Sequence, residues 1–275
     1  MMRFAVIGSP VAQSKSPQMF NAAFRERGLN AVYERIEIQD GELAPFIQRV
    51  RHGDFAGLNV TMPHKQTILP LLDSLTPLAS RIGAVNTVFV RDDKLIGDNT
   101  DCEGFVTGLV NETGLTIKDA KILILGAGGA ARAICFGLCA AGALSLTIVN
   151  RDQNKALPLC RQLTAEFDLV TIEHRPWSVL DNPLPDDLSL IVNATALGME
   201  DRPWPHLEFV NTCPQLVCVA DIVTQDKDTE LITAAKHCGL KTMSGLTMLL
   251  HQAVLAFELM TGQKAPVEVM RAVQS

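Results

Sequence analysis

The sequence has little that would mark a metal centre, a disulfide framework or a membrane anchor. Its seven cysteines form no Cys-x-x-Cys pair, and its six histidines are scattered, with no carboxylate at ligand spacing. We therefore expect no metal site and reduced cysteines. No apolar run is long enough to cross a bilayer, and the first residues lack the apolar length and cleavage site of a signal peptide. These absences favour a cytoplasmic protein.

Positive charge is also scarce. Asp and Glu number 30 against 24 Lys and Arg, which gives a net charge of −6. This balance argues against nucleic acid as a partner, and it means that an anionic ligand must be held by local features and not by the overall field. The 275 residues, 47% of them hydrophobic, are enough for one large or two modest domains.

A glycine-rich stretch, KILILGAGGAAR at residues 121–132, says most about function. Its apolar run predicts a buried parallel strand, and the alanine-rich segment that follows the glycines predicts a helix. In that context Gly-x-Gly-x-x-Ala predicts dinucleotide binding rather than a merely tight turn. Gly126 permits the turn, Gly128 lets a pyrophosphate approach the backbone, and Ala131 lets the helix pack closely on the strand.

Strand-like and helix-like segments alternate along the whole chain, which predicts an α/β protein. Strands are expected at 3–7, 32–38, 56–61, 85–90, 95–96, 123–125, 146–150, 190–193 and 216–221. Helices are expected at 17–27, 43–51, 63–72, 103–112, 130–141, 230–237 and 248–261. We place a domain boundary near 101–114 and expect the last helix to return to the first domain. A ligand cleft would then lie between the domains, at the carboxyl ends of the strands.

The end of the strand at 146–150 bears on the choice of cofactor. A carboxylate there would accept from the ribose 2′-hydroxyl of NAD, whereas an arginine suits the 2′-phosphate of NADP. Asn150 and Arg151 occupy the tip and Lys155 follows one turn later, so NADP is favoured. NAD stays open as the cofactor, because the Asp152 carboxylate could accept from its ribose. Arg151 can also be a solvated loop charge that binds neither cofactor.

Three polar clusters interrupt the first domain: residues 14–17 (SKSP), 59–65 (NVTMPHK), and 86–87 (NT) with 98–101 (DNTD). If they converge, hydroxyls and amides surround one lysine and one aspartate, a pocket that suits a small hydroxylated ligand. A lysine oriented by a carboxylate can transfer the alcohol proton of a dehydrogenase reaction. Each cluster has a plainer explanation, because Ser16, Thr61, Asn99 and Asp101 are all suited to capping helices and Lys65 can be a solvated first-turn residue.

Eight motifs in this order resemble the shikimate dehydrogenase family, nearly from end to end. They are Ser14–Pro17, Asn59–Lys65, Ala84–Thr87, Asn99–Asp101, Gly126–Ala130, Asn150–Arg151, Asn193–Met199 and Gly245–Ala253. The resemblance implies reduction of 3-dehydroshikimate to shikimate by NADPH, in aromatic amino-acid biosynthesis. It also implies a mixed α/β substrate-binding domain (1–101, with 246–275 returning to it) and a Rossmann-type doubly wound parallel-sheet domain (102–245). Small molecules are then the expected partners, and monomer and homodimer both stay open.

The resemblance also implies site residues, motif by motif. Lys65 and Asp101 would be the catalytic pair. The substrate would be bound by Ser14 and Ser16 at its carboxylate and, elsewhere, by Asn59, Thr61, Asn86, Thr224 and Gln252. The cofactor would be bound by Gly126, Ala127, Gly128, Gly129, Ala130, Asn150, Arg151 and Lys155, with Thr195, Ile222, Gly245 and Met248 at the nicotinamide end.

Some positions depart from the family pattern. Thr224 replaces a tyrosine that contacts substrate, Asp226 replaces a proline, Ser244 stands where an aspartate is common, and Cys102 where a glycine is common. These changes keep open a quinate/shikimate dehydrogenase that uses NAD through Asp152. A non-catalytic sensor of shikimate or nicotinamide is a second alternative, although it should have lost one member of the catalytic pair.

Overall fold

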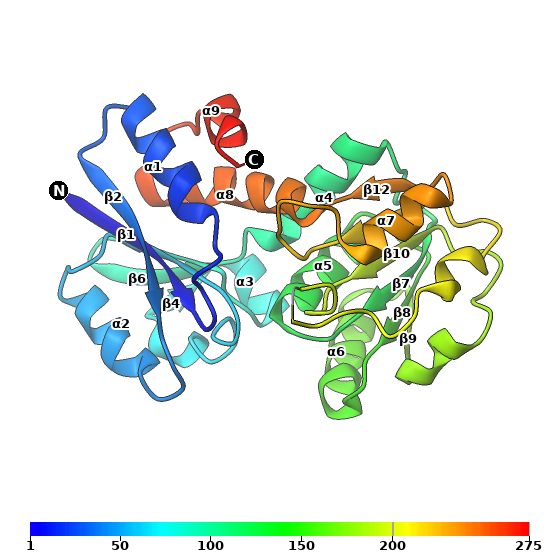
Figure 1. The fold of residues 1–275 in the computed structure, drawn as a ribbon. Helices are drawn as coiled ribbons and strands as arrows, with labels where there is room; N and C mark the ends of the chain where they lie inside the picture. Colours follow the sequence, from blue (N-terminus) through cyan, green and yellow to red (C-terminus); the bar gives the residue numbers. More distant parts are fainter. Residues whose placement is uncertain (200, 275) are drawn as a thin grey trace. The chain divides into compact units, whose positions relative to one another are not determined.

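The structure is a computed structural model that describes residues 1–199 and 201–274. The chain forms two compact units. Unit 1 consists of Met1–Gly104 and Leu249–Ser275, and unit 2 of Phe105–Met248 (Figure 1). The division falls inside two helices, α4 (Asp101–Thr113) and α8 (Gly245–Thr261). Unit 1 is therefore assembled from both ends of the chain.

Unit 1 is built on a mixed six-stranded sheet of order β2-β1-β3-β5-β6-β4. Its strands are β1 (Met2–Gly8), β2 (Ala31–Glu37), β3 (Gly57–Val60), β4 (Ser74–Leu75), β5 (Thr87–Arg91) and β6 (Lys94–Asp98). β1 runs parallel to β2 and β3, whereas β5 runs antiparallel to both β3 and β6. The hairpin of β5 and β6 was predicted from the sequence.

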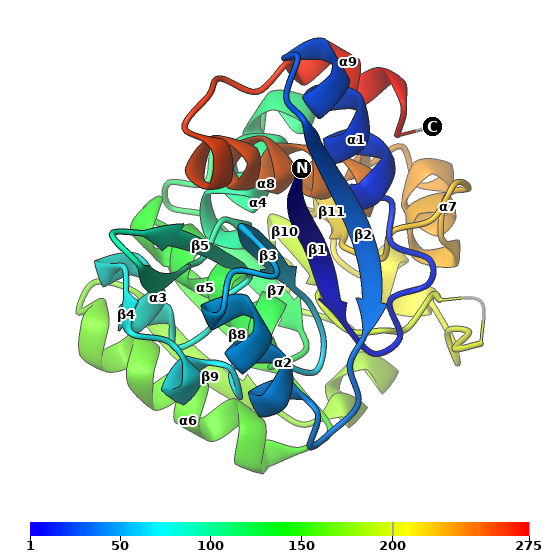
Figure 2. The same cartoon turned by 90° about the vertical axis from the view of Figure 1, so that its left-hand side faces the viewer.

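Helices cover both faces of this sheet. Successive side chains of a strand point to opposite faces, so alternate residues of β1 pack with different helices. Phe4 and Val6 pack with α1 (Ser16–Glu26), α9 (Val267–Ala272) and the part of α8 in unit 1. Ala5 and Ile7 pack with α2 (Leu43–Arg51). Figure 2 shows α1 and α8 on one side of β1 and β2, and α2 on the other.

Unit 2 contains six strands, all parallel, in the order β12-β11-β10-β7-β8-β9. They are β7 (Lys121–Leu125), β8 (Ser145–Val149), β9 (Thr171–Arg175), β10 (Leu190–Asn193), β11 (Cys218–Asp221) and β12 (Lys241–Met243). The chain starts in the middle with β7, moves outward to β9 and returns to β10. This order is the doubly wound Rossmann topology, which confirms the predicted fold class.

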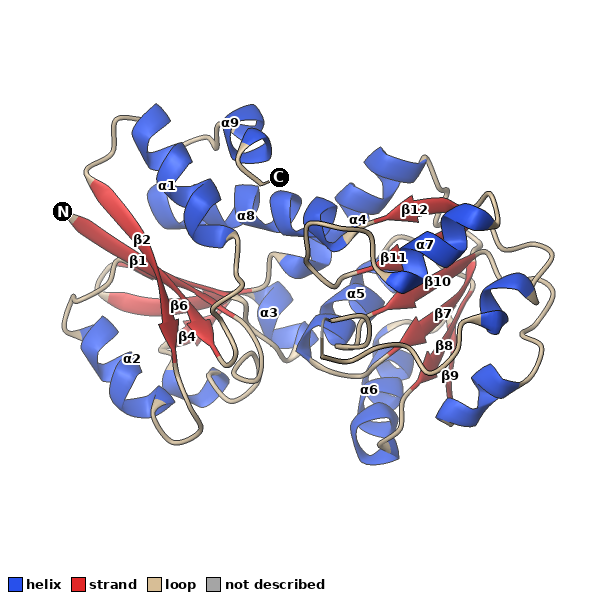
Figure 3. Ribbon diagram, in the orientation of Figure 1, coloured by secondary structure: helices blue, strands red, loops and turns tan. Residues whose placement is uncertain are grey.

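Among the described residues, the helices α5 (Gly129–Ala140), α6 (Gln153–Glu166) and α7 (Glu230–His237) pack on this sheet (Figure 3). Leu231 and Ala235 of α7 join the core on the face of Leu123 and Leu125. Among the described residues, no helix has the length and apolar character needed to cross a bilayer.

The expected helix at 63–72 is wrong. The segment forms turns and the short 3-10 helix η1 (Leu69–Leu71). The carbonyl of Lys65 accepts from the backbone N–H of Val85 at 2.7 Å, not from a residue four positions on. Pro70 also lacks the N–H that a helix would need there. This loop therefore belongs to the polar edge of the sheet.

Several elements were not predicted. They are β4, α3 (Pro77–Ile82), α6, β9, β12 and α9. In addition, α8 begins at Gly245, three residues before the expected start, and α9 follows it. The helix α6 includes Pro158, a residue that disfavours a helix interior. Leu159 and Leu163 on its inner face are buried and favour the helix through packing.

Candidate functional site

The polar clusters of unit 1 meet because of the directions of its strands. The carboxyl ends of β3 and β6 share one edge of the sheet with the amino end of β5, since β5 is antiparallel to both. Register places Asn59 opposite Thr87, and Thr87 opposite Asp98. The clusters at 59–65, 86–87 and 98–101 are therefore brought together, which meets the condition that the sequence left open.

Lys65 and Asp101 form an ion pair at this edge. The distance from Lys65 Nζ to Asp101 Oδ2 is 2.5 Å, and the two side chains are only 14% and 6% exposed. Asp101 is the first residue of α4, and its backbone N–H donates to Oδ1 of Asn99. A solvated first-turn lysine is thus the wrong interpretation of Lys65. A lysine held this way has the geometry of a proton-transfer group.

Asn86 joins this pair to the rest of the edge. Its amide nitrogen donates to Asp101 Oδ1 and Thr100 Oγ1, both at 2.9 Å, and lies 3.3 Å from Gln252 Oε1. Its amide oxygen accepts from the Thr100 N–H at 2.8 Å. All four side chains are nearly or fully buried. The amide therefore fixes the orientation of the Asp101 carboxylate, with Gln252 contributed by the last part of the chain.

A buried tyrosine connects two other candidate residues. The hydroxyl of Tyr33 donates to Asn59 Oδ1 at 2.7 Å and is also hydrogen-bonded to Ser16. Burial raises the pKa of Tyr33 well above its ordinary value, against a smaller lowering by the Ser16 hydrogen bond. The phenol therefore stays protonated, and it holds Ser16 and Asn59 in fixed positions.

The helix caps expected from the sequence lie in the same region, and only one of those described next is formed. Ser16 is not an N-cap, because α1 begins at Ser16 and Lys15 precedes it without a capping side chain. The N–H of Ser16 instead lies 3.3 Å from Ser14 Oγ. Thr61, half-buried, is followed by no regular helix to cap. Asn99 does cap α4, accepting from the N–H groups of Asp101 and Cys102.

The turn between β7 and α5 combines a strained glycine with open space at the start of a helix. Gly126 has φ +112°, and a Cβ there would lie 2.8 Å from the carbonyl oxygen of Ala194. Gly128 precedes α5 as its N-cap, and a Cβ there would meet no protein atom within 4 Å. Open space thus lies at a helix N-terminus whose N–H groups attract phosphate. Ala127 lies in this turn, Gly129 and Ala130 are the first two residues of α5, and the buried Ala131 packs α5 on the sheet.

The residues after β8 expose two positive side chains at the end of the strand. Arg151 and Lys155 are exposed, and Arg151 Cζ lies 5.8 Å from the centre of the Trp177 ring. Asp152 caps α6, with Oδ1 accepting from the Asn154 N–H at 2.9 Å. Asn150 Nδ2 donates to the carbonyl of Asp152 at 2.7 Å. The Asp152 carboxylate therefore already has a structural role, which weakens the case for it as an NAD ribose acceptor.

Two of the remaining cofactor candidates, Thr195 and Ile222, follow β10 and β11, and the other two, Gly245 and Met248, lie at the start of α8. Thr195 bonds to Asn193 Oδ1 through both its N–H and its hydroxyl. A Cβ on Gly245 would lie 2.6 Å from the Ile222 carbonyl, so only glycine fits there. Met248 is buried. Thr224, on the loop after β11, is the single predicted substrate residue that belongs to unit 2.

Comparison with known proteins decides the family. A curated relative from Desulforamulus reducens, named "Shikimate dehydrogenase (NADP(+))", is 41% identical over 273 residues, covering 98% of this chain and 92% of that protein. The chain belongs to the shikimate dehydrogenase family. Residues 6–88 match the family's substrate binding domain, residues 109–180 match shikimate / quinate 5-dehydrogenase, and residues 245–273 match the shikimate 5'-dehydrogenase C-terminal domain.

Two solved structures are also similar over nearly the whole chain. Shikimate 5-dehydrogenase from Thermus thermophilus, in complex with NADP(H) and shikimate, is 36% identical with a TM-score of 0.85, covering 100% of this chain and 98% of that one. Quinate dehydrogenase from Corynebacterium glutamicum, in complex with NAD, is 31% identical with a TM-score of 0.86, covering 99% and 98%.

The sequence did not point to three residues that contact the candidate site residues or their neighbours: Tyr33, Trp177 and Asp221. Tyr33 is the chain's single tyrosine and falls on the inward side of a strand, which could have marked it. Trp177 lies in a short 3-10 helix, η2 (Trp177–Asp181), for which the sequence carries no periodic signal. Asp221 ends a predicted strand but gave no sign of its full burial.

Proposed function

We propose that this protein catalyses the reversible, NADP-dependent reduction of 3-dehydroshikimate to shikimate. The observation that carries the proposal is the Lys65–Asp101 ion pair, set among hydroxyl and amide side chains in a chain of this family. Both members of the pair are retained, which argues against a non-catalytic homologue.

NADPH, when bound, supplies the hydride that reaches the carbonyl carbon. The Lys65 ammonium donates a proton to the carbonyl oxygen as it becomes the alcohol, and in the reverse direction the neutral amine takes the proton back. Asp101 orients the ammonium through the 2.5 Å contact, while Asn86 holds the other carboxylate oxygen. One ketone, one hydride and one proton thus give one alcohol.

The substrate is held by the rest of the polar edge. Ser14 donates a hydroxyl hydrogen bond to its carboxylate, and Ser16 does so by turning its hydroxyl from Tyr33 to the ligand. Thr61, Asn59, Asn86 and Gln252 take the hydroxyl side of the substrate. Support comes from their convergence in unit 1, with Tyr33 fixing Ser16 and Asn59. We accordingly assign substrate binding to residues 1–101 with 246–275, and cofactor binding to 102–245.

The cofactor is held by the turn from Gly126 to Ala130, where the open space beside Gly128 fits a pyrophosphate. Asn150, Arg151 and Lys155 take the 2′-phosphate end, and Thr195, Ile222, Gly245 and Met248 take the nicotinamide end. The use of Asp152 as a helix cap supports NADP over NAD.

All seven cysteines are free thiols and six are buried, which supports a cytoplasmic location.

Steady-state oxidation of shikimate and quinate, each with NADP⁺ and NAD⁺, tests the proposal. We expect the highest kcat/KM for shikimate with NADP⁺. Faster turnover of quinate with NAD⁺ would favour the quinate/shikimate alternative, for which Thr224 is the motivating residue. Binding of shikimate and of a nicotinamide cofactor, with no turnover in any of the four combinations, would favour the non-catalytic sensor.

Substitution of Thr224 tests which residue sets substrate choice. Thr224→Tyr restores the family's longer hydroxyl donor and should change the ratio of kcat/KM for shikimate over quinate. Thr224→Ser, which keeps a short hydroxyl, serves as the control and should leave the ratio close to that of the wild type. An unchanged ratio in Thr224→Tyr would remove this residue from substrate recognition.

A further inference from the structure

A stack of three side chains in unit 2 ends at the exposed Arg151. The Arg151 guanidinium carbon lies 5.8 Å from the centre of the Trp177 ring. Behind Trp177, the ring of Trp204 is stacked at 6.4 Å with an interplanar angle of 23°. Trp177 is half-buried and Trp204 is 8% exposed. The arginine therefore contacts a rigid aromatic surface that comes from a different part of the chain.

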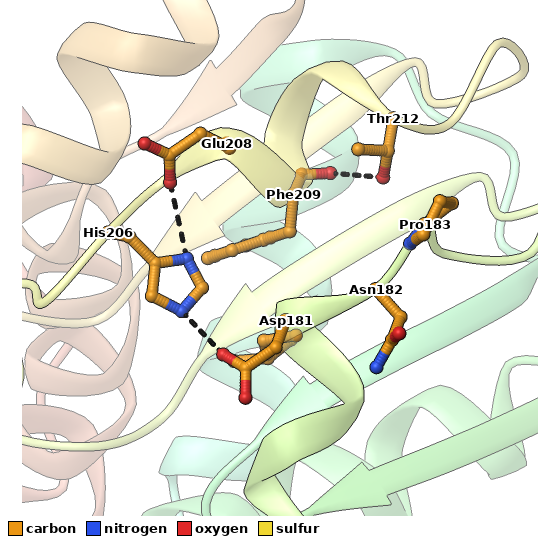
Figure 4. Close-up of a pocket in the computed structure, with 8 residues that line it drawn as sticks. Asp181, Asn182, Pro183, His206, Glu208, Phe209 and Thr212 are labelled. Carbon is orange, nitrogen blue, oxygen red and sulfur yellow. Dashed lines mark hydrogen bonds and ion pairs between the residues drawn. The ribbon is translucent and has the colours of Figure 1, made fainter.

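The segment that carries Trp177 is itself anchored. Leu180, in the same 3-10 helix η2, is buried in the core of unit 2. Asp181, at the end of η2, lies 3.0 Å from Nε2 of His206, whose Nδ1 faces Glu208 at 3.3 Å (Figure 4). The ring centre of Phe209, which follows Glu208 in the chain, lies 6.0 Å from that of Trp204. Leu180 and Asp181 thus hold the end of η2, while the stacking on Trp204 holds Trp177 at its start.

We propose that Trp177 is a positioning residue for Arg151, and that this contact sets the preference for a 2′-phosphorylated cofactor. A cation above an aromatic face is attracted by the ring quadrupole. An exposed arginine loses rotamer freedom when it binds a phosphate, and a side chain already held on a ring loses less. Trp177 therefore acts through Arg151 and need not touch the cofactor.

The inference rests on the proposed function, since it concerns how NADP is told from NAD. It makes a specific demand on energetics: removal of the ring weakens binding only of ligands that carry the 2′-phosphate, and only while Arg151 is present. A residue that merely maintained the fold would weaken both kinds of ligand together.

Calorimetric titration of the full-length protein with adenosine 2′,5′-bisphosphate and with AMP tests this demand. In Trp177→Leu, the Kd of the bisphosphate should rise about two- to fivefold, the range expected for an exposed cation–π contact, while the Kd of AMP stays constant. Trp177→Phe, which keeps a ring face, should restore the wild-type ratio. With NADP⁺ in turnover, KM should rise in Trp177→Leu and kcat should not.

Two controls define what Trp177 acts on. In an Arg151→Ala background, Trp177→Leu should cause no further loss for the bisphosphate. Arg175→Ala removes an exposed arginine two residues from Trp177 that already pairs with Glu173, and it should leave both Kd values unchanged. Thermal unfolding monitors each variant, and Trp177→Met replaces Trp177→Leu if the latter fails to fold.

The outcomes separate the inference from the proposed function. If the wild-type protein binds the bisphosphate no better than AMP, the assignment of NADP fails. If the wild type discriminates and Trp177→Leu discriminates equally well, only the role of Trp177 is overturned. An equal loss of affinity for both ligands would also overturn it, because Trp177 would then act on the part of the cofactor that both ligands share. A loss of affinity for the bisphosphate that persists without Arg151 would overturn it too, because Trp177 would not act through Arg151.

Discussion

Lys65 meets Asp101 although it lies in a turn with no regular helix, and that contact gives the first prediction. Lys65→Ala should lower kcat by about 10²–10⁴, the range for loss of a proton-transfer group, with a smaller effect on the KM for shikimate. Lys94→Ala removes an exposed lysine of unit 1 from β6 and serves as the control. Steady-state kinetics with unchanged kcat in Lys65→Ala would exclude Lys65 from the chemistry.

Asp221 gives a prediction about pH. Its carboxylate is fully buried and accepts from Thr229, Val223 and Asn193, yet burial outweighs these hydrogen bonds and raises its pKa from 3.8 to about 6. The folded state therefore holds this proton more tightly than the unfolded chain. The stabilisation is complete below about pH 4 and is lost as pH rises through about 6.

The matching measurement compares wild type with Asp221→Asn, whose amide does not titrate. Between about pH 4 and pH 7, the free energy of unfolding of the wild type should fall relative to the variant by up to about 3 kcal/mol, the value of a shift near two units. Denaturant unfolding across this range measures the difference. Parallel curves for the two proteins would mean that Asp221 ionises normally in the folded state.

Single residues also show what the sequence could and could not reveal of the sites. The convergence of Asn59, Asn86 and Asp101 was predictable because their motifs lie at the end of β3, the start of β5 and the start of α4, and the end of one strand lies beside the start of its antiparallel neighbour. The contacts of Tyr33 and Trp177 were not predictable, because they depend on side chains that pack across long separations, Tyr33 with Ser16 and Asn59 and Trp177 with Trp204 and Arg151.

At the scale of the element, the β7–α5 turn contains two glycines with different reasons to be glycine. Gly126→Ala should lower stability by more than about 1 kcal/mol, because its φ is positive and the new Cβ would press on Ala194. Gly128→Ala should leave the melting temperature unchanged, because φ is −82° and the space is open. It should instead weaken NADP⁺ binding by about tenfold or more, since the methyl group occupies the place of the pyrophosphate.

Thermal unfolding without cofactor and calorimetric titration of NADP⁺ separate the two effects. Each variant serves as the control for the other, because both add one methyl group within the same turn. Normal NADP⁺ binding in a stable Gly128→Ala protein would place the pyrophosphate elsewhere.

Elements were predictable where the hydrophobic pattern is long and regular, as in β7, α2 and α7. The failures have local causes. The segment at 63–72 has apolar residues at helical spacing, but its Lys65 carbonyl is recruited by Val85 and Pro70 interrupts the ladder. The strands β4 and β12 are only two and three residues long, so pairing with a neighbour creates them rather than any pattern of their own.

At the scale of the whole molecule, each unit has its own core and its own proposed ligand, which predicts separable responses. Hydrogen exchange measured with adenosine 2′,5′-bisphosphate alone should slow in residues 126–132 and 150–155 of unit 2. With shikimate alone it should slow in residues 59–65 and 84–101 of unit 1. AMP serves as the control for the bisphosphate and should protect residues 150–155 less. Protection of residues 59–65 by the bisphosphate alone would contradict the assignment of ligands to units.

Unit 1 needs the last residues of the chain to complete its core. Phe257 lies 6.1 Å from Phe20 and 5.8 Å from Phe24, and Met270 is buried in the same cluster. During translation, every residue of unit 2 is made before Phe257. The part of unit 1 that is made first can therefore complete its core only at the end of synthesis, after all of unit 2. A premature stop before α8 would spare the Rossmann core and leave Lys65 and Asp101 without the helix that carries Gln252.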